Sequence, residues 1–154
     1  MATAQSGYIF LTRNTDKVGN DSPGYWNHCA IISSRLTVVE AQEEPGQVIE
    51  VTLQSFVDRY PEYLLYYSDF SKGMGRFAPQ TLGKKYGKYA LFGTYNCVTV
   101  IQYCYEKASR QNVGWRTPDD VQAFGKKHWD LVQHKKDYQN WVMPKNGWFE
   151  GRLR

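Results

Sequence analysis

The sequence predicts an α+β fold, with an antiparallel sheet drawn mainly from the first half of the chain and helices from the second half. Two observations support this prediction. Short apolar runs bounded by turn residues recur up to about residue 67, which is typical of strands, and longer runs of helix-forming residues follow residue 77. No linker, repeat or low-complexity segment divides the 154 residues, so we expect a single domain spanning residues 1–154.

The first half predicts five strands and one short helix. Runs rich in β-branched and aromatic residues, separated by Gly, Pro, Asn and Asp, are the basis of the strand predictions. The predicted strands are residues 8–11, 28–33, 36–41, 47–51 and 63–67, with a polar, turn-rich loop at residues 14–24. Thr52 is a suitable cap for a short helix at residues 53–59, one side of which is apolar.

The second half predicts mostly helices. A glycine-containing loop at residues 72–75 is followed by one helix within residues 77–86 and another that begins at Cys97 and extends to about residue 110. Thr117 precedes a proline and two acids, which together make a strong helix start. The last predicted elements are a strand at residues 129–133 and an aromatic tail at residues 134–154, whose final part, residues 141–154, we expect to wrap the surface.

Charge and hydropathy exclude several classes of partner. The formal net charge of +4 is spread over lysine pairs at residues 84–85, 126–127 and 135–136, so we expect no nucleic-acid partner and only a weak attraction to anionic surfaces. No segment approaches the roughly 18 apolar residues of a membrane span, and the first residues lack a signal-peptide pattern. We therefore expect a soluble protein without integral membrane contact, either cytosolic, which is favoured, or already stripped of a signal peptide.

The three cysteines have different expected roles. An odd number without framework spacing argues against a disulfide scaffold, and Cys29 and Cys104 are interpreted as small buried hydrophobes. Cys97 follows Asn96 at the start of a predicted helix. A thiol placed there lies among unpaired backbone N–H groups and at the positive end of the helix dipole, which favour the thiolate.

A histidine far upstream offers a partner for that thiol. His28 lies in a predicted strand, and a cysteine and histidine distant in sequence are what a thiol nucleophile and its base require. With a three-residue hairpin loop at residues 33–35, Glu40 lies opposite His28, about 5 Å away, whereas a two-residue loop places Ala41 there. Taken singly, each of these residues is more often structural than catalytic.

The order of the motifs resembles the circularly permuted branch of the NlpC-type papain-like cysteine peptidases, the YiiX/YebB-like proteins. The resemblance spans about residues 7–133. The matching segments are, in order, residues 7–11 (GYIFL), 27–32 (NHCAII), 38–41 (VVEA), 51–56 (VTLQSF), 87–89 (GKY), 96–101 (NCVTVI) and 117–120 (TPDD).

This resemblance implies a papain-like fold, in which an antiparallel sheet packs against helices that include the one bearing the nucleophile. It implies Cys97 as nucleophile, His28 as general base, Glu40 as the residue that orients the histidine, and Tyr89 near the oxyanion. The implied activity is that of a thiol hydrolase, a peptidase or amidase acting on cell-wall or other small peptides through a thioester. It requires no cofactor and no metal.

Three alternatives stay open. The lecithin–retinol acyltransferase-like proteins carry an Asn-Cys pair similar to Asn96-Cys97, which would make a lipid acyl group the substrate. A non-catalytic binding module on the same fold is the second alternative. The third is a zinc site, because Cys29 and Cys104, together with His28 and Cys97, provide suitable ligand atoms, although without the usual motif spacing. The sequence does not indicate an oligomeric state.

Overall fold

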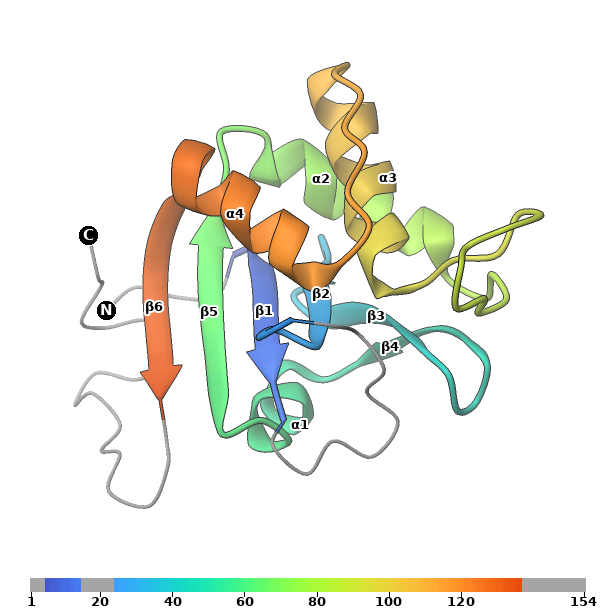
Figure 1. The fold of residues 1–154 in the computed structure, drawn as a ribbon, viewed down its shortest axis with the longest axis horizontal. Coiled ribbons are helices and arrows are strands. Elements are labelled where there is room, and N and C mark those ends of the chain that lie inside the picture. The colour runs from blue at the N-terminus through green and yellow to red at the C-terminus, as the bar shows by residue number, and fades with distance from the viewer. Residues whose placement is uncertain (1–4, 15–23, 137–154) are drawn as a thin grey trace.

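The computed structural model describes residues 5–14 and 24–136, and within them a six-stranded antiparallel sheet packs against four α-helices (Figure 1). The strands are β1 (Ile9–Arg13), β2 (His28–Ile32), β3 (Val38–Gln42), β4 (Gln47–Val51), β5 (Glu62–Tyr67) and β6 (Asp130–Lys136). The helices are α1 (Leu53–Asp58), α2 (Ser71–Phe77), α3 (Cys97–Ser109) and α4 (Pro118–His128), with a 3₁₀ turn η1 (Ala78–Thr81). The predicted α+β class is confirmed.

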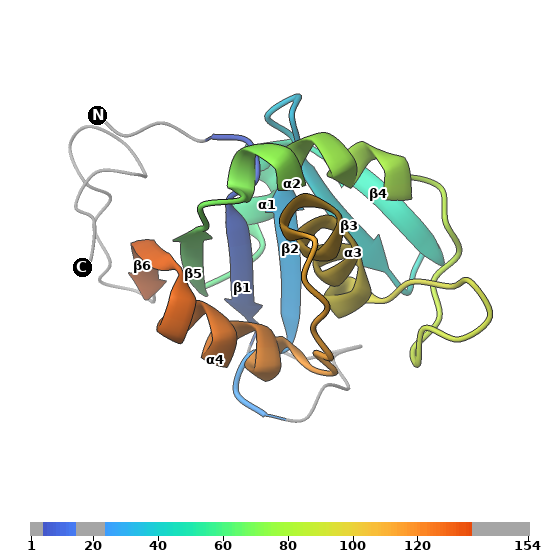
Figure 2. The ribbon, with the colours of Figure 1, turned by 90° about the horizontal axis from the view of Figure 1, so that it is seen from above.

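The sheet has the strand order β4-β3-β2-β1-β5-β6 and is covered on both faces. Helices α2, α3 and α4 lie on one face and α1 on the other, as Figure 2 shows. Because both faces are covered, the central strands β1 and β2 are buried at nearly every position, which explains their continuous apolar runs.

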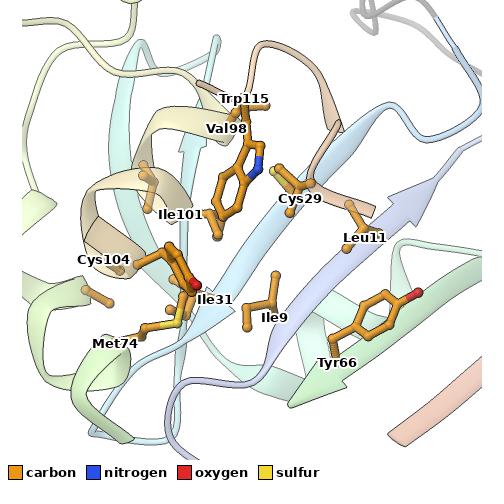
Figure 3. Packing of buried hydrophobic residues seen from close by; sticks show 14 of the residues in the cluster. Ile9, Leu11, Cys29, Ile31, Tyr66, Met74, Val98, Ile101, Cys104 and Trp115 are labelled. Atoms are coloured by element: carbon orange, nitrogen blue, oxygen red, sulfur yellow. The ribbon is translucent and has the colours of Figure 1, made fainter. Parts of the chain in front are cut away.

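Two hydrophobic clusters fill the two sides of the sheet. The larger cluster joins the sheet to α2 and α3 through residues such as Ile9, Ile31, Met74 and Ile101 (Figure 3). The smaller one packs α1 on the opposite face, where the ring of Phe10 lies 4.8 Å from that of Phe56. The sheet is thereby fixed between α1, which is followed by Arg59, and α3, which begins at Cys97; both residues belong to the site described below.

The turn between β2 and β3 is longer than either prediction. Ile32 pairs with Val38, so five residues, 33–37, connect the strands. The Ser33 N–H donates to the Thr37 carbonyl over 2.7 Å, and Leu36 adopts a positive φ of 62°. Neither a two-residue nor a three-residue loop is present.

This turn changes the register of the hairpin by two residues. Continuing the observed pairing places Gln42 opposite His28, so the prediction that Glu40 lies directly opposite His28 is wrong, and so is the alternative with Ala41. Because side chains alternate between the two faces of a strand, a shift of two residues leaves Glu40 on the same face as His28. The two side chains therefore meet diagonally.

The loop predicted at residues 72–75 is wrong, because this segment lies inside α2. Its glycines provide room for close packing. A Cβ at Gly75 would lie 1.8 Å from Ser6 Oγ, and a Cβ at Gly73 would lie 3.2 Å from Ala108 Cβ on α3. The glycines therefore mark contact points of a helix with its neighbours rather than a turn.

Of the helix predicted within residues 77–86, only Phe77, the last residue of α2, and the 3₁₀ turn η1 are helical. The following residues instead run beside the edge strand β4. The Val48 N–H donates to the Lys84 carbonyl and the Tyr86 N–H donates to the Gly46 carbonyl, both over 2.9 Å. Backbone groups of an edge strand gain partners in this way, which competes with helix formation.

The other predicted elements are confirmed within two or three residues. Thr52 caps α1, and Thr117 caps α4 with Pro118 at its first position. Strand β6 extends to Lys136, so the first residues assigned to the tail belong to the sheet. Residues 141–154 and most of the loop at 14–24 lie outside the described residues. Within the described ranges, no helix is both long and apolar enough to cross a membrane.

Candidate active site

Helix α3 begins at Cys97, as predicted, and its cap is complete. The Asn96 side chain accepts a hydrogen bond from the Thr99 N–H, and the Thr99 hydroxyl accepts one from the Asn96 N–H, both over 2.9 Å. This capping box leaves the Cys97 N–H, at the first helical position, without an acceptor inside the helix. The thiol is thus attached next to a free backbone donor at the positive end of α3.

His28 is the first residue of β2 and is mostly buried. Its ring stacks on that of Tyr60, with centroids 6.1 Å apart and an angle of 23° between the planes. The chain just before it is held by α4, because the Tyr25 and Trp26 N–H groups both donate to the Asp119 carboxylate, over 3.0 and 2.8 Å. The first turn of α4 therefore fixes the entry into β2.

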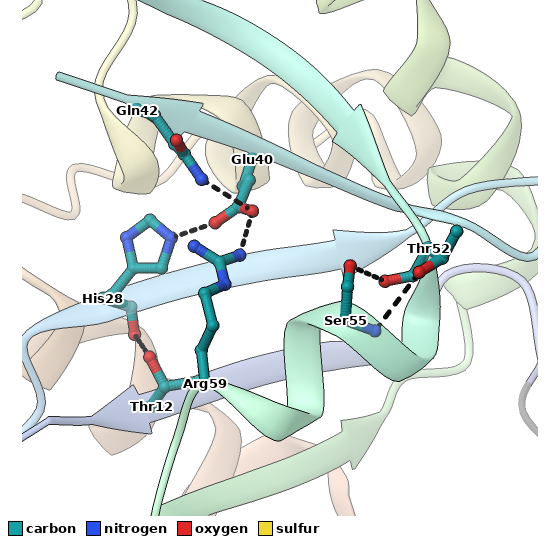
Figure 4. Close-up of polar contacts among 7 residues, drawn as sticks. All are labelled: Thr12, His28, Glu40, Gln42, Thr52, Ser55 and Arg59. Atoms are coloured by element: carbon teal, nitrogen blue, oxygen red, sulfur yellow. Dashed lines mark hydrogen bonds and ion pairs between the residues drawn. The ribbon is translucent and has the colours of Figure 1, made fainter. Parts of the chain in front are cut away.

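Glu40 lies on β3, completely buried, and its carboxylate is surrounded by hydrogen-bond donors (Figure 4). Its Oε1 atom lies 2.8 Å from Nε2 of His28. Its Oε2 atom accepts from Arg59 Nη2 and, over 3.0 Å, from Gln42 Nε2. A buried carboxylate is costly unless it is paired, and here a cation and two further donors provide the pairing.

The second ring nitrogen of His28 is left for the thiol. The His28 and Cys97 side chains interact, and each shifts the pKa of the other. Because Nε2 is held by Glu40, the nitrogen that faces Cys97 is Nδ1. The structure thus brings three of the four predicted site residues together, with His28 between Cys97 and Glu40.

The pKa values in this chain favour charged partners. Hydrogen bonds from Cys29 and then from His28 hold the pKa of Cys97 well below its ordinary value, although burial opposes the charge. Burial opposes the charge on His28 too, but Tyr60, Cys97 and Glu40 raise the pKa of the imidazole well above its ordinary value. The arrangement therefore stabilises a thiolate beside an imidazolium.

Glu40 stays ionised within the same chain. Burial by itself would raise the pKa of its carboxyl group, but the hydrogen bond and charge of His28 and the charge of Arg59 lower it. An ionised Glu40 accepts a hydrogen bond from the N–H of His28 Nε2 and stabilises the positive ring. This is the orienting position that the sequence predicts for it.

Cys29 has a second role that its apolar setting did not reveal. It is buried in the core, as predicted, but its thiol and main chain interact with Cys97 and lower the pKa of that thiol. Burial, and then Cys97 itself, raise the pKa of the Cys29 thiol, so Cys29 stays protonated and acts as a donor. Cys104 is buried in the core, where burial raises its pKa, and matches its prediction as a packing residue.

Tyr89 is not brought to this group. Its side chain is 75% exposed, and its ring faces the Lys88 ammonium group, 5.7 Å from the centroid. The interactions of Cys97 instead involve Cys29 and His28. The oxyanion role predicted for Tyr89 therefore has no supporting contact in the structure.

Four contributors to the site were not predicted: Cys29, Gln42, Arg59 and Asp119. Cys29, Arg59 and Asp119 contact residues far from them in sequence, which spacing alone does not reveal, whereas Gln42 lies two residues from Glu40. The one usable signal was the parity of β3, where Glu40 and Gln42 share a face of the strand. Among the described residues, no group of three or more His, Cys, Asp or Glu side chains is arranged to hold a metal ion.

No protein-family model matches the sequence, and no curated protein matches it. Among solved structures, the fold is similar to the crystal structure of the metalloprotein YiiX from Escherichia coli O157:H7, with a TM-score of 0.56. The two sequences are 15% identical, and the alignment covers 95% of this chain and 92% of that one. At this identity the likeness concerns the fold alone, and the chain has a YiiX-like fold.

Proposed function

We propose that this protein is a thiol hydrolase that cleaves amide bonds, with Cys97 as nucleophile, His28 as base and Glu40 as the residue that orients the base. The observation that carries the proposal is the placement of His28, which interacts with Cys97 on one side and lies 2.8 Å from Glu40 Oε1 through Nε2 on the other. We also propose that the fold belongs to the permuted NlpC-type, papain-like class, which the order of the motifs favours.

The first half of the reaction forms a thioester. The Cys97 thiolate attacks the amide carbonyl carbon, an S–C bond forms, and the carbonyl electron pair moves to oxygen. The free N–H of Cys97 at the start of α3 donates to that oxyanion. As the oxyanion collapses, the C–N bond breaks and the His28 imidazolium gives its proton to the departing amine.

The second half releases the acid. Neutral His28 accepts a proton from water, and the oxygen of that water attacks the thioester carbonyl carbon. The S–C bond then breaks, the carboxylic acid departs and the thiolate–imidazolium pair is restored. Throughout, the Glu40 carboxylate holds His28 through Nε2 and stabilises its charged form. Atoms and charge balance without a further reactant.

The YiiX structure is described as that of a metalloprotein, which raises the question of a metal in this chain. The donor set here does not fit one. His28 occupies one oxygen of Glu40, and Arg59 and Gln42 occupy the other. A carboxylate that is already paired with an Arg cation is a poor metal ligand, so no step of the proposed mechanism uses a metal.

Replacing Cys97 tests the nucleophile directly. We expect Cys97→Ala to abolish both amide hydrolysis and labelling by a thiol-directed peptide probe, while Cys104→Ala, which also removes one cysteine, retains both. Mass spectrometry of the probe adduct measures the labelling. Equal labelling of the Cys97→Ala variant would refute the assignment of the nucleophile.

The pH dependence of alkylation separates an active thiol from a binding module on the same fold. Because the pKa of Cys97 is lowered, its alkylation by iodoacetamide should stay fast well below the ordinary thiol value of about 8.5. Removing the partner in His28→Asn should move the profile back toward that value. A wild-type profile centred near 8.5 would favour the binding module.

A lipid acyl substrate is distinguished by a different assay. In that case the protein would transfer a labelled fatty acyl chain instead of cleaving an amide bond.

A further inference from the structure

The loop that leads into α3 exposes an unusual set of apolar side chains. Residues 87–94, named the finger here, project from the body of the molecule (Figure 1). Phe92 is 100% exposed, Tyr89 75% and Leu91 58%. The other large hydrophobic side chains that are exposed in the described ranges are Tyr25 at 44% and Leu36 at 51%. Exposed apolar groups gathered in one place indicate an interaction surface.

Hydrogen bonds give the finger a defined shape. At its base, the Gly87 N–H donates to the Tyr95 carbonyl over 3.0 Å, and Asn96 Nδ2 donates to the Lys88 carbonyl over the same distance. Near its tip, the Thr94 N–H donates to the Leu91 carbonyl over 3.1 Å. The finger is therefore connected to the cap of the Cys97 helix.

Two residues of the finger adopt a backbone conformation that residues other than glycine usually avoid. Ala90 has a φ of 52° and Phe92 a φ of 56°, both in the left-handed region. Such geometry is unfavourable for residues with a Cβ and persists where the surrounding structure enforces it, commonly at functional segments. Here it accompanies a bulky ring that points into solvent instead of into the core.

The charges on the finger and on the chain just before it have a single sign. Lys84, Lys85 and Lys88 lie at its base and side and are exposed. Residues 71–105 contain five Lys or Arg residues and no Asp or Glu. The segment that carries the finger therefore has a net positive charge with no acid in it, which complements an anionic partner.

We propose that the finger docks onto an anionic lipid surface. Leu91 and Phe92 enter the boundary between headgroups and acyl chains, Tyr89 lies at the level of the headgroups, and the lysines contact lipid phosphates. An apolar tip flanked by lysines fits this boundary, where burial of apolar side chains and attraction to anionic lipid act together. The contact goes beyond the proposed function, because it does not depend on the chemistry of Cys97.

Co-sedimentation of the full chain with vesicles tests this proposal. The vesicles contain phosphatidylcholine, either alone or mixed with phosphatidylglycerol. We expect the wild type to sediment with the mixed vesicles, and Leu91→Ser/Phe92→Ser to bind at least about tenfold more weakly. Lys84→Gln/Lys85→Gln should bind the mixed vesicles about 30-fold more weakly than the wild type does, and this loss should be confined to the mixed vesicles.

Matched variants control for apolarity and charge elsewhere on the molecule. Leu36→Ser removes a similarly exposed apolar side chain, and Lys126→Gln/Lys127→Gln removes an adjacent lysine pair from the end of α4. Both should bind within about twofold of the wild type. Losses equal to those of the finger variants would overturn the proposal, because the binding would then lack a defined surface.

Two other results would overturn it. One is a wild type that does not sediment with the mixed vesicles. The other is a change in the lipid-free molecular mass on Leu91→Ser/Phe92→Ser, measured by analytical ultracentrifugation, which would make the finger a contact between copies of this chain. Cys97→Ala should sediment like the wild type, so failure of the hydrolase proposal is visible separately from failure of the lipid contact.

Discussion

At the scale of single residues, the central feature is one ionised carboxylate held inside the protein. Glu40 is completely buried and stays charged because Arg59, His28 and Gln42 all donate to it. Arg59 is itself held over the rings of Phe56 and Tyr60, with its guanidinium carbon 5.1 and 5.3 Å from their centroids. The cation that stabilises Glu40 is thus positioned by Phe56 of α1 and by Tyr60 just after it, the same two rings that pack against His28.

Removing that cation should weaken the protein in a pH-dependent way. We expect Arg59→Met to lower the free energy of unfolding at pH 7 by about 1–3 kcal/mol, since it leaves a buried carboxylate with fewer donors. The value is modest because the Arg59 side chain is 39% exposed and water screens its charge. Because the pKa of folded Glu40 is lowered, the stabilisation is present above about pH 4.3 and is lost as the pH falls through the folded value.

Urea unfolding of both proteins at pH 7 and pH 3 measures this effect. The difference between wild type and Arg59→Met should shrink at the lower pH. Arg35→Met is the matched control, because it breaks the exposed pair with Glu50 and should cost less than about 1 kcal/mol. Equal losses for the two variants, or a difference that does not change with pH, would contradict the assigned role of Arg59.

The site residues were predictable to different degrees. The thiolate-favouring position of Cys97 followed from local signals, because a capping Asn and a helix-forming run lie side by side in the sequence. The face of Glu40 followed from strand parity, even though the predicted turn was too short. The donor role of Cys29 could not be predicted, because it depends on α3 packing against β2, a contact between residues almost 70 positions apart.

At the scale of elements, the cap of α3 combines stability with the placement of the nucleophile. Asn96 accepts from the Thr99 N–H and also donates to the Lys88 carbonyl, so it fixes both the helix start and the chain before it. Helix α4 has an equivalent box, in which Thr117 accepts from the Asp120 N–H over 3.3 Å. The two caps differ in that only the first adjoins the thiol.

This difference predicts distinct effects of two similar substitutions. Asn96→Ala and Thr117→Ala should each cost about 1 kcal/mol of unfolding free energy, because each removes one capping acceptor. Only Asn96→Ala should also slow the alkylation of Cys97 at neutral pH, by several-fold, because the thiol loses its alignment with His28. Urea unfolding and iodoacetamide kinetics measure the two effects, and identical kinetics for both variants would contradict the placement role.

Helices with caps were predictable, and α2 was not. Its sequence, SKGMGRF, contains two glycines and no side-chain cap, so local propensity favours a loop. Tertiary contacts decide otherwise, since Gly73 packs closely on Ala108 of α3 and Gly75 on Ser6. Information of this kind is not present in the local sequence.

At the scale of the whole molecule, α2 connects the start of the sheet to the helical layer. Besides the close approach of Gly75 to Ser6, a Cβ at Gly7 would lie 1.6 Å from the Ser71 carbonyl oxygen. The Gly7 N–H also donates to the Ile32 carbonyl over 2.6 Å. The segment before β1 is therefore enclosed between α2 and the end of β2.

Enlarging Gly75 tests how tightly this junction is packed. Alanine favours helices, but its Cβ would lie 1.8 Å from Ser6 Oγ and 2.8 Å from the Gly7 nitrogen. We expect Gly75→Ala to lower the free energy of unfolding by about 1–3 kcal/mol through overpacking. Gly114→Ala, where no heavy atom lies within 4 Å of the new Cβ, should stay within about 0.5 kcal/mol. Thermal unfolding monitored by circular dichroism distinguishes the two variants. A Gly75→Ala variant as stable as the wild type would show that the junction is loosely packed.

The diagonal meeting of His28 and Glu40 across one hairpin also constrains how this protein can change over evolution. Adding or removing two residues in the turn at 33–37 returns the carboxylate to the face of the histidine, whereas a single insertion or deletion turns every side chain of β3 over. In related sequences that keep the site, the spacing between the histidine and its acid should therefore vary in even steps.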